Sequence, residues 1–379
     1  MKYLGRLFRI IVGLVFVFSG FVKSVDPYGT AYKITEYIGV FGLGGLIQAI
    51  PWLPIVISVT LCSLEFVVGL MLISGYFKKP INWLVALMMF FFTVLTFIDA
   101  LTNKVTDCGC FGDAVKLTNW QTFWKNIILD VLLVLSFMWD KLKYSSKANR
   151  TYGRFYLILV GFLVLTFTIF NAVYEPMIDF RPWKEGNRMV PMPEDQKPPI
   201  SYATYRNNST NKEKEFGMEE LMQAYKDDPD FATNWTFLNS RVINPNVIAA
   251  DGFSMVGFVE QKDIAFEFLT YQGVSFIVTI VDLDVPSHKT MRKVSNFLRR
   301  AAEKGCQTAI ITASPIAKWA EFTNKHDIKD IIIYSTDDKA IMTIMRSNPG
   351  IVMIKNGQVV KKYSWRLLPP VENINIDNQ

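Results

Sequence analysis

The sequence predicts a membrane α-helical bundle followed by a soluble α/β domain. Half of the 379 residues are hydrophobic, and this apolar excess is concentrated before about residue 175. Toward the C-terminus, short β-branched runs alternate with segments of helical periodicity, as in domains that pack helices on a sheet. A chain of this length is expected to form two or three domains.

Five apolar segments are long enough to cross a bilayer. They cover residues 6–23, 53–76, 81–101, 120–139 and 155–174. The first has a basic start but lacks a small-x-small cleavage site, so a retained helix is expected rather than a signal peptide. These spans predict a four-helix membrane domain over residues 1–145 and a fifth transmembrane helix over 146–176.

Lysine and arginine in the short loops set the expected orientation. They gather before the first span, after the second and between the fourth and fifth, which places those three segments in the cytoplasm. The alternate loops are charge-balanced and are expected outside, together with everything after the fifth span. The net charge of +6 is therefore explained by orientation signals rather than by binding to nucleic acid.

The C-terminal part is predicted to be a Pro- and charge-rich tether, 177–215, and a soluble domain, 216–379. Within that domain, strand-like and helix-like patterns alternate. The order is a strand at 274–283, a helix from His288 to the stop at Gly305, a strand at 307–312, a helix at 314–326, a strand at 329–336, a helix at 337–345, and two strands joined by a turn at 355–357.

This order, with Pro349 opening the final pair of strands, resembles the thioredoxin-like fold over roughly residues 250–365. The resemblance implies a cis peptide bond before Pro349 and places the CxxC motif of that fold within residues 281–290. No cysteine occurs there. Because thioredoxin exchange requires two thiols at the helix N-terminus, the domain is expected to bind or position a partner rather than to reduce it.

Two cysteines, Cys108 and Cys110, flank Gly109 in the outward loop "TDCGCFGDAV". A disulfide in so small a ring is expected to be strained and easily reduced, which suits exchange better than a structural staple. Three interpretations remain: redox exchange, a structural disulfide or simple packing, and metal binding, for which no further ligand lies nearby in sequence. No metal site is predicted.

Ionisable residues inside the spans are candidate functional residues, because burying them in lipid is costly. Glu65 lies near the middle of the second span and Asp130 in the fourth, while Lys23 ends the first on the side of the cysteine pair. They are predicted to support that pair by proton or charge balance, or alternatively to form polar contacts between helices. Cys62 lies on the same helical face as Glu65.

The other reactive side chains favour structural roles. Cys306 lies between a helix and a strand, where a small buried hydrophobic residue is expected. His288 and His326 are far apart in sequence and have no carboxylate or cysteine at ligand spacing, so neither is favoured as a metal ligand or general base. No inverted repeat favours a transporter.

Three stretches of the membrane half, "RIIVGLVFVFSGFVKSVDPY", "SLEFVVGLMLISGY" and "DCGCFGD", together resemble the DoxX-type and MauE-type (methylamine utilisation) membrane families. The resemblance covers about residues 3–140. The shared positions are Ser19, Gly20, Lys23, Glu65, Gly69 and the run Cys108–Gly112. It implies a multi-pass protein of the bacterial inner membrane. MauE-type proteins are linked to maturation of disulfide-containing periplasmic enzymes, and DoxX-type proteins to quinone-coupled sulfur chemistry.

The predicted function is thiol–disulfide exchange with a periplasmic or envelope client, or its maturation, through Cys108 and Cys110. A quinone is one candidate electron acceptor, although the aromatic residues near the outer face also fit an interfacial belt. The alternative is a non-catalytic membrane scaffold whose soluble domain docks another envelope protein. In that case the cysteine pair would only brace its loop.

Overall fold

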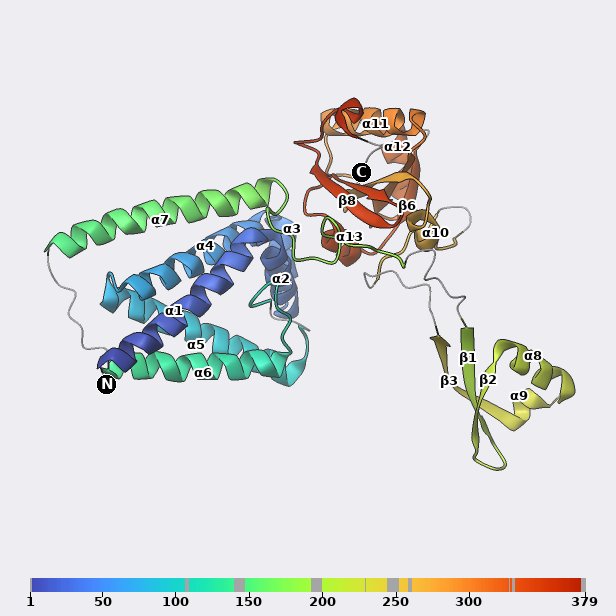
Figure 1. Cartoon of the computed structure of the whole chain (residues 1–379), viewed down its shortest axis with the longest axis horizontal. Coiled ribbons are helices and arrows are strands. Elements are labelled where there is room, and N and C mark those ends of the chain that lie inside the picture. The colour runs from blue at the N-terminus through green and yellow to red at the C-terminus, as the bar shows by residue number, and fades with distance from the viewer. Residues whose placement is uncertain are drawn as a thin grey trace. The chain divides into compact units, whose positions relative to one another are not determined.

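The computed structural model describes residues 2–105, 109–139, 147–191, 200–228, 230–243, 252–257, 261–326, 328 and 331–375. The chain divides into two compact units, Met1–Arg181 and Pro182–Gln379 (Figure 1). The first unit is helical throughout its described secondary structure, and the second combines helices with two β-sheets.

The first unit contains five helices that are long and apolar enough to cross a membrane, which confirms the predicted spans. Its helices are α1 (Lys2–Val25), α2 (Pro27–Val40), α3 (Gly44–Ala49), α4 (Leu53–Ser74), α5 (Lys78–Thr102), α6 (Asn119–Trp139) and α7 (Lys147–Val173). Helix α1 packs against α4 and α6, α5 packs against α6, and α7 packs against α4. Many apolar side chains of these helices are exposed in the structure, as expected for surfaces that face lipid.

Small residues bring α1 and α4 close together. A Cβ atom added at Gly20 would lie 2.4 Å from the backbone nitrogen of Phe66, and one at Gly69 would lie 2.7 Å from the backbone nitrogen of Val17. Backbones approach this closely in membrane bundles only where glycine or another small residue lines the contact. The α1–α4 contact is therefore the tightly packed centre of the membrane unit.

Two short helices, α2 and α3, follow α1 and were not predicted from the sequence. Helix α2 starts directly after α1, because Asp26 caps it by accepting a hydrogen bond from the Gly29 backbone N–H at 3.1 Å and Pro27 occupies its first turn. Its composition is mixed, so it lacks the long apolar run that identifies a span. The result is a bend between α1 and α2, called the α1–α2 corner below.

The second unit is built around a five-stranded sheet with the order β6-β5-β4-β7-β8. The strands are β4 (Val274–Ile280), β5 (Gln307–Thr312), β6 (Ile332–Ser335), β7 (Gly350–Lys355) and β8 (Gln358–Ser364). The helices around them are α10 (Ala265–Leu269), α11 (His288–Glu303), α12 (Trp319–His326) and α13 (Asp338–Ile344). Short 3₁₀ turns lie at Ile316–Lys318 and Val371–Asn373. Strands β4, β5 and β6 are parallel, whereas β7 and β8 are antiparallel to their neighbours.

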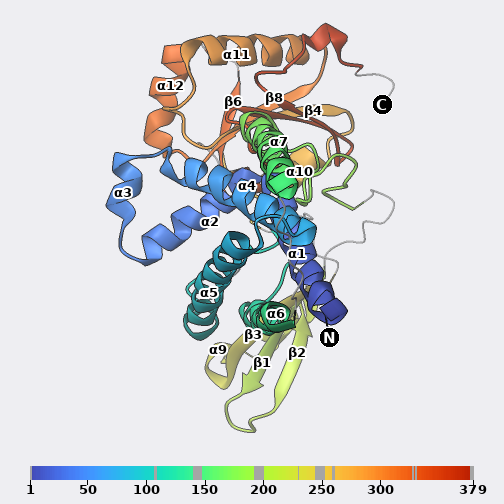
Figure 2. The same ribbon diagram turned by 90° about the vertical axis from the view of Figure 1, so that its left-hand side faces the viewer.

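This arrangement is the thioredoxin-like fold. Every residue of β4 is buried, as its β-branched run predicted. Helix α11 begins at the Ser287 cap and buries one face, while α12 runs crosswise to it (Figure 2). The Asn348–Pro349 peptide bond is cis, as the resemblance implied. The two faces of the sheet bury separate apolar clusters, one under α11 and α12 and the other under α10 and α13.

The structure differs from the predicted tether at residues 177–215. Trp183 and Met189 are fully buried in the core of the second unit, and the Met189 backbone N–H donates to Gly357 O at 2.7 Å. Residues after 199 begin a separate three-stranded antiparallel sheet. It comprises β1 (Ile200–Asn207), β2 (Glu213–Gly217) and β3 (Trp235–Ile243), with α8 (Met218–Asp227) and α9 (Phe231–Asn234) beside it.

The predicted domain boundary at residue 216 therefore needs correction, because it falls inside β2. The sequence suggested a tether there because proline and charged residues are frequent. Charged side chains, however, are accommodated on exposed strands, for example by the Arg241–Glu215 pair between β3 and β2. Residues 192–199, within the predicted tether, lie outside the described residues.

Candidate functional site

The loop between α5 and α6, residues 103–118, is called the cysteine loop. Cys108 lies outside the described residues, and Cys110 lies in a tight turn. The Gly112 backbone N–H donates to Gly109 O at 3.0 Å. Both glycines have positive φ, +64° at Gly109 and +51° at Gly112, a region that side-chain-bearing residues rarely adopt. The Cys-Gly-Cys-Phe-Gly spacing therefore encodes a turn that presents Cys110.

Side chains of α1 and α6 hold this turn in place. Ser19 Oγ donates a hydrogen bond to Cys110 O at 2.6 Å. The Phe111 ring packs against Phe18, with centroids 5.4 Å apart, and the Lys125 ammonium lies 4.5 Å from the centroid of Phe111. These contacts anchor the cysteine loop, with Cys110, to α1 and α6.

Two of the predicted supporting residues meet directly beneath this turn. Lys23 Nζ lies 2.8 Å from Glu65 Oε2, and the two side chains are only 8% and 5% exposed. Lys23 is within electrostatic range of both Cys110 and Cys62. A buried carboxylate and ammonium in contact satisfy one another, which is how a charge is tolerated inside a membrane helix bundle.

Asp130, the third predicted supporting residue, lies in a different contact. It accepts a hydrogen bond from Thr93 Oγ1 at 2.7 Å, between α6 and α5. Nearby, Asn126 donates to Thr96 Oγ1 at 3.1 Å across the same pair of helices. These are the interhelical polar contacts that the sequence allowed as an alternative, and none of the described contacts joins Asp130 to the cysteine loop.

One residue of the site, Lys33, could not be identified from sequence spacing alone. The aliphatic chain of Lys33, on α2, lies against Gly109, where an added Cβ would be 3.2 Å from Lys33 Cγ. Cys62 is fully buried, and its Sγ lies 3.7 Å from Ser58 Oγ. The signal that could have identified Lys33 was its position in a charge-balanced outer loop, but no pattern linked it to Gly109.

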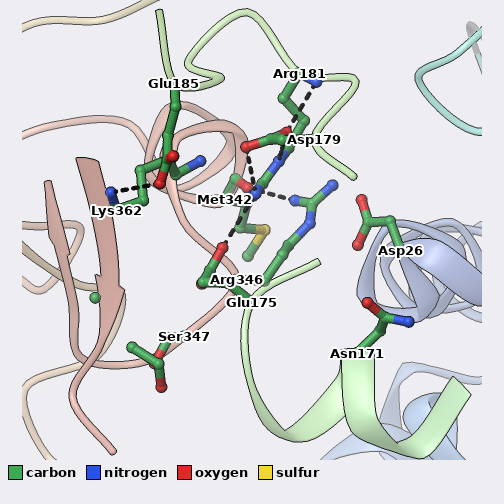
Figure 3. Close-up of polar contacts among 12 residues, drawn as sticks. Asp26, Asn171, Glu175, Asp179, Arg181, Glu185, Met342, Arg346, Ser347 and Lys362 are labelled. Carbon is green, nitrogen blue, oxygen red and sulfur yellow. Dashed lines mark hydrogen bonds and ion pairs between the residues drawn. The ribbon is translucent and has the colours of Figure 1, made fainter. Parts of the chain in front are cut away.

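Arg181 is a second buried charged residue, beside the α1–α2 corner (Figure 3). Its Nε donates to Asp179 Oδ1 at 2.7 Å and its Nη2 to Glu175 Oε2 at 3.1 Å. Burial disfavours the charged guanidinium, but Glu175, Asp179 and Asp26 outweigh that effect and raise the pKa of Arg181. Arg181, Asp26 and Asp113 line one small cavity, so residues 175–181 fold over the corner beside the cysteine loop.

In the second unit, the loop between β4 and α11 occupies the position where the thioredoxin-like fold carries its CxxC. Ser287 Oγ accepts a hydrogen bond from the Thr290 backbone N–H at 3.2 Å and thereby caps α11. Asp284 forms an ion pair with Lys318, and Val281 N donates to Asn348 Oδ1 at 3.3 Å beside the cis proline. Cys306 is buried in the core and lies outside this loop.

Comparison with known proteins separates the same two parts. The profile of the family described as "Methylamine utilisation protein MauE" matches residues 1–139. Protein TlpB of Flavobacterium psychrophilum is 28% identical over 161 residues, which make up 42% of this chain and 41% of TlpB. The match therefore spans less than half of that relative's length.

Two solved structures are also similar. A secreted disulfide oxidoreductase of Mycobacterium tuberculosis is 12% identical, with a TM-score of 0.24, and the match covers 30% of this chain and 87% of that one. A peroxiredoxin-like protein of Aquifex aeolicus is 15% identical, with a TM-score of 0.22, and the match covers 48% and 75%. The thioredoxin-like assignment itself rests on the strand order and connections. The chain thus joins a membrane part similar to MauE to a soluble part with a thioredoxin-like fold.

Proposed function

We propose that this chain is a membrane thiol–disulfide exchange protein in which Cys108 and Cys110 are the reactive pair and the thioredoxin-like domain holds the client. The observation that carries the proposal is the buried Lys23–Glu65 ion pair within electrostatic range of Cys110. A thiolate is the reactive form of cysteine, and nearby cations favour it.

The proposed step is a balanced exchange. A client thiolate attacks the Cys108–Cys110 disulfide and forms a mixed disulfide, and a second client thiolate releases it. The client dithiol becomes a disulfide, and the pair gains two electrons and two protons as two thiols. The Ser19 hydrogen bond to the Cys110 carbonyl restrains the backbone that carries this cysteine, which would reduce the entropy cost of the attack.

The proposed location is the bacterial inner membrane, with the N-terminus in the cytoplasm and both the cysteine loop and the soluble domain in the periplasm. Five spans and the positions of the lysine and arginine residues support this orientation. The partner is a periplasmic or envelope protein that contains cysteines, and a membrane quinone is a candidate for re-oxidising the pair afterwards.

A scaffold is the second candidate function, and one observation favours it. The β4–α11 loop contains no cysteine, and its polar groups are already used by the Ser287 cap and the Asp284–Lys318 pair. On this alternative the soluble domain would bind a partner without chemistry, and the cysteine pair would only brace its loop.

The test is single-turnover exchange with a probe of known chemistry. The oxidised full chain in lipid nanodiscs is mixed with reduced, unfolded ribonuclease, and free thiols on both proteins are counted by mass-tagged alkylation. Exchange predicts one disulfide gained by the probe for each one lost from the chain, with loss of transfer in Cys110→Ala and retention in the matched control Asp130→Asn. An inert wild-type chain would favour the scaffold.

A further inference from the structure

The structure brings together the only two histidines of the chain, which are separate in sequence. His288 begins α11 and His326 ends α12, and their rings are nearly parallel, with centroids 5.5 Å apart and an interplanar angle of 21°. Phe322 contacts His326 on the same helix, with ring centroids 4.8 Å apart. His288 is exposed, whereas His326 is 4% exposed.

His326 is buried in an environment that suits only its neutral form. Among the described residues, neither of its ring nitrogens has a hydrogen-bond partner. An imidazolium there would be a buried charge without compensation. Burial, the Lys325 ammonium on the same helix and His288 on α11 together lower the pKa of His326, and these are the charged or titratable groups that act on it among the described residues.

Helix α12 also holds the loop that precedes α11. At its start, Trp319 Nε1 donates to Ser314 O at 3.1 Å, and Ser314 Oγ accepts from the Leu283 backbone N–H at 3.0 Å. Lys318 forms an ion pair with Asp284 in the same loop. At its end, His326 stacks on His288. The β4–α11 loop and the first residue of α11 are therefore attached to both ends of α12.

We propose that the His288–His326 contact is a proton-sensitive latch that holds α12 against the β4–α11 loop at neutral pH and releases it in acid. Protonation of His326 places a buried cation on a ring that Lys325 and His288 already disfavour as a cation, so the protonated ring leaves its position. The β4–α11 loop, which leads into His288, then loses its attachment at the end of α12. Exchange activity of the cysteine pair is not required for this behaviour.

The direction of the pH effect follows from linkage. The folded state holds His326 neutral, so its proton affinity is lower than in the open state. The latch is therefore fully effective above the ordinary histidine pKa of about 6.5 and weakens as the pH falls below it. If one proton is taken up on opening, the opening equilibrium rises up to about ten-fold for each pH unit within that window.

The test is hydrogen–deuterium exchange of the full chain in nanodiscs at pH 7.5 and 5.5, corrected for the intrinsic pH dependence of exchange. Residues 281–290 and 313–326 are expected to lose protection at pH 5.5, by up to about ten-fold, while β7 stays protected. His326→Phe, which keeps the ring contacts without a titrating group, is expected to remove the effect. Unchanged protection in the wild type, or an equal loss in His326→Phe, would overturn the latch. If His326→Phe fails to fold, His288→Phe provides the check, because replacing this exposed ring should reduce the loss of protection.

Discussion

The cysteine loop of the membrane unit and the β4–α11 loop of the soluble unit each have what the other lacks. The cysteine loop of the membrane unit carries Cys108 and Cys110, and it rests on a buried ion pair whose side chains are 8% and 5% exposed. The β4–α11 loop of the soluble unit has the thioredoxin-like framework but no cysteine, and its ion pair, Lys318–Asp284, is 41% and 65% exposed.

A thioredoxin-like fold and a closely spaced cysteine pair thus reside in separate parts of one chain. A buried ion pair costs desolvation energy and persists only with good geometry or a functional requirement, whereas an exposed pair contributes little to stability. Substitutions in the ion pair beside the cysteine loop are therefore expected to cost more stability than substitutions in the ion pair of the β4–α11 loop. Thiol–disulfide exchange is therefore expected at the cysteine loop, and binding of a partner at the soluble domain that carries the β4–α11 loop.

The largest effect is expected from removing the reactive sulfurs. The double variant Cys108→Ala/Cys110→Ala should insert and fold normally but lose all exchange with reduced ribonuclease, because no other cysteine lies in either loop. Thiol counting on the probe measures the loss. A fall in membrane abundance, rather than in exchange, would instead indicate that the pair braces its loop.

A large effect is also expected from Lys23→Met, which removes the cation near Cys110 and leaves Glu65 buried without its partner. Breaking a buried pair on one side costs about 3 kcal/mol, and exchange should fall roughly ten-fold if one pKa unit of thiolate stabilisation is lost. The double variant Lys23→Met/Glu65→Leu separates the two effects. It should regain thermal stability in nanodiscs but not exchange, and recovery of both would show that the pair is only structural.

How far the sequence could predict this site depends on the kind of contact. The spans followed from hydropathy and β4 to β8 from periodicity, because those patterns are local. The Lys23–Glu65 contact joins residues 42 positions apart, and the rotation of each helix about its axis decides it. The hydrogen bond from Ser19 to the Cys110 carbonyl likewise joins residues that are far apart in sequence. The sheet of β1, β2 and β3 escaped prediction because its strands carry mainly polar and aromatic residues on exposed faces.

A smaller effect is expected at Arg181, which closes the corner beside the cysteine loop. Arg181→Met leaves Glu175 and Asp179, which are 15% exposed, without their cation. It should destabilise residues 175–181 by about 2 kcal/mol, measured as faster hydrogen exchange in that segment. Lys318→Met, which removes the exposed cation at the β4–α11 loop, is the matched control and should leave its own segment almost unchanged. If Arg181→Met and Lys318→Met speed hydrogen exchange in their segments equally, the buried and exposed ion pairs do not differ in their contribution to stability.

The smallest effect is expected from adding thiols to the soluble domain. In the background without Cys108 and Cys110, the pair Asp284→Cys/Ser287→Cys places a CxxC before α11. Loss of the Ser287 cap should cost about 1 kcal/mol. The helix N-terminus favours thiolate, so weak exchange with ribonuclease should appear. Thiols that never form a disulfide would show that this loop lacks the geometry for chemistry.

The central claim is that the cysteine pair of the membrane unit exchanges electrons. The redox state of Cys108 and Cys110 in cells, trapped by acid quench and mass-tagged alkylation before and after a brief pulse of reductant, tests it most directly. If the pair exchanges electrons, it becomes reduced during the pulse and is oxidised again within minutes. A pair fixed in one state throughout the pulse would contradict it.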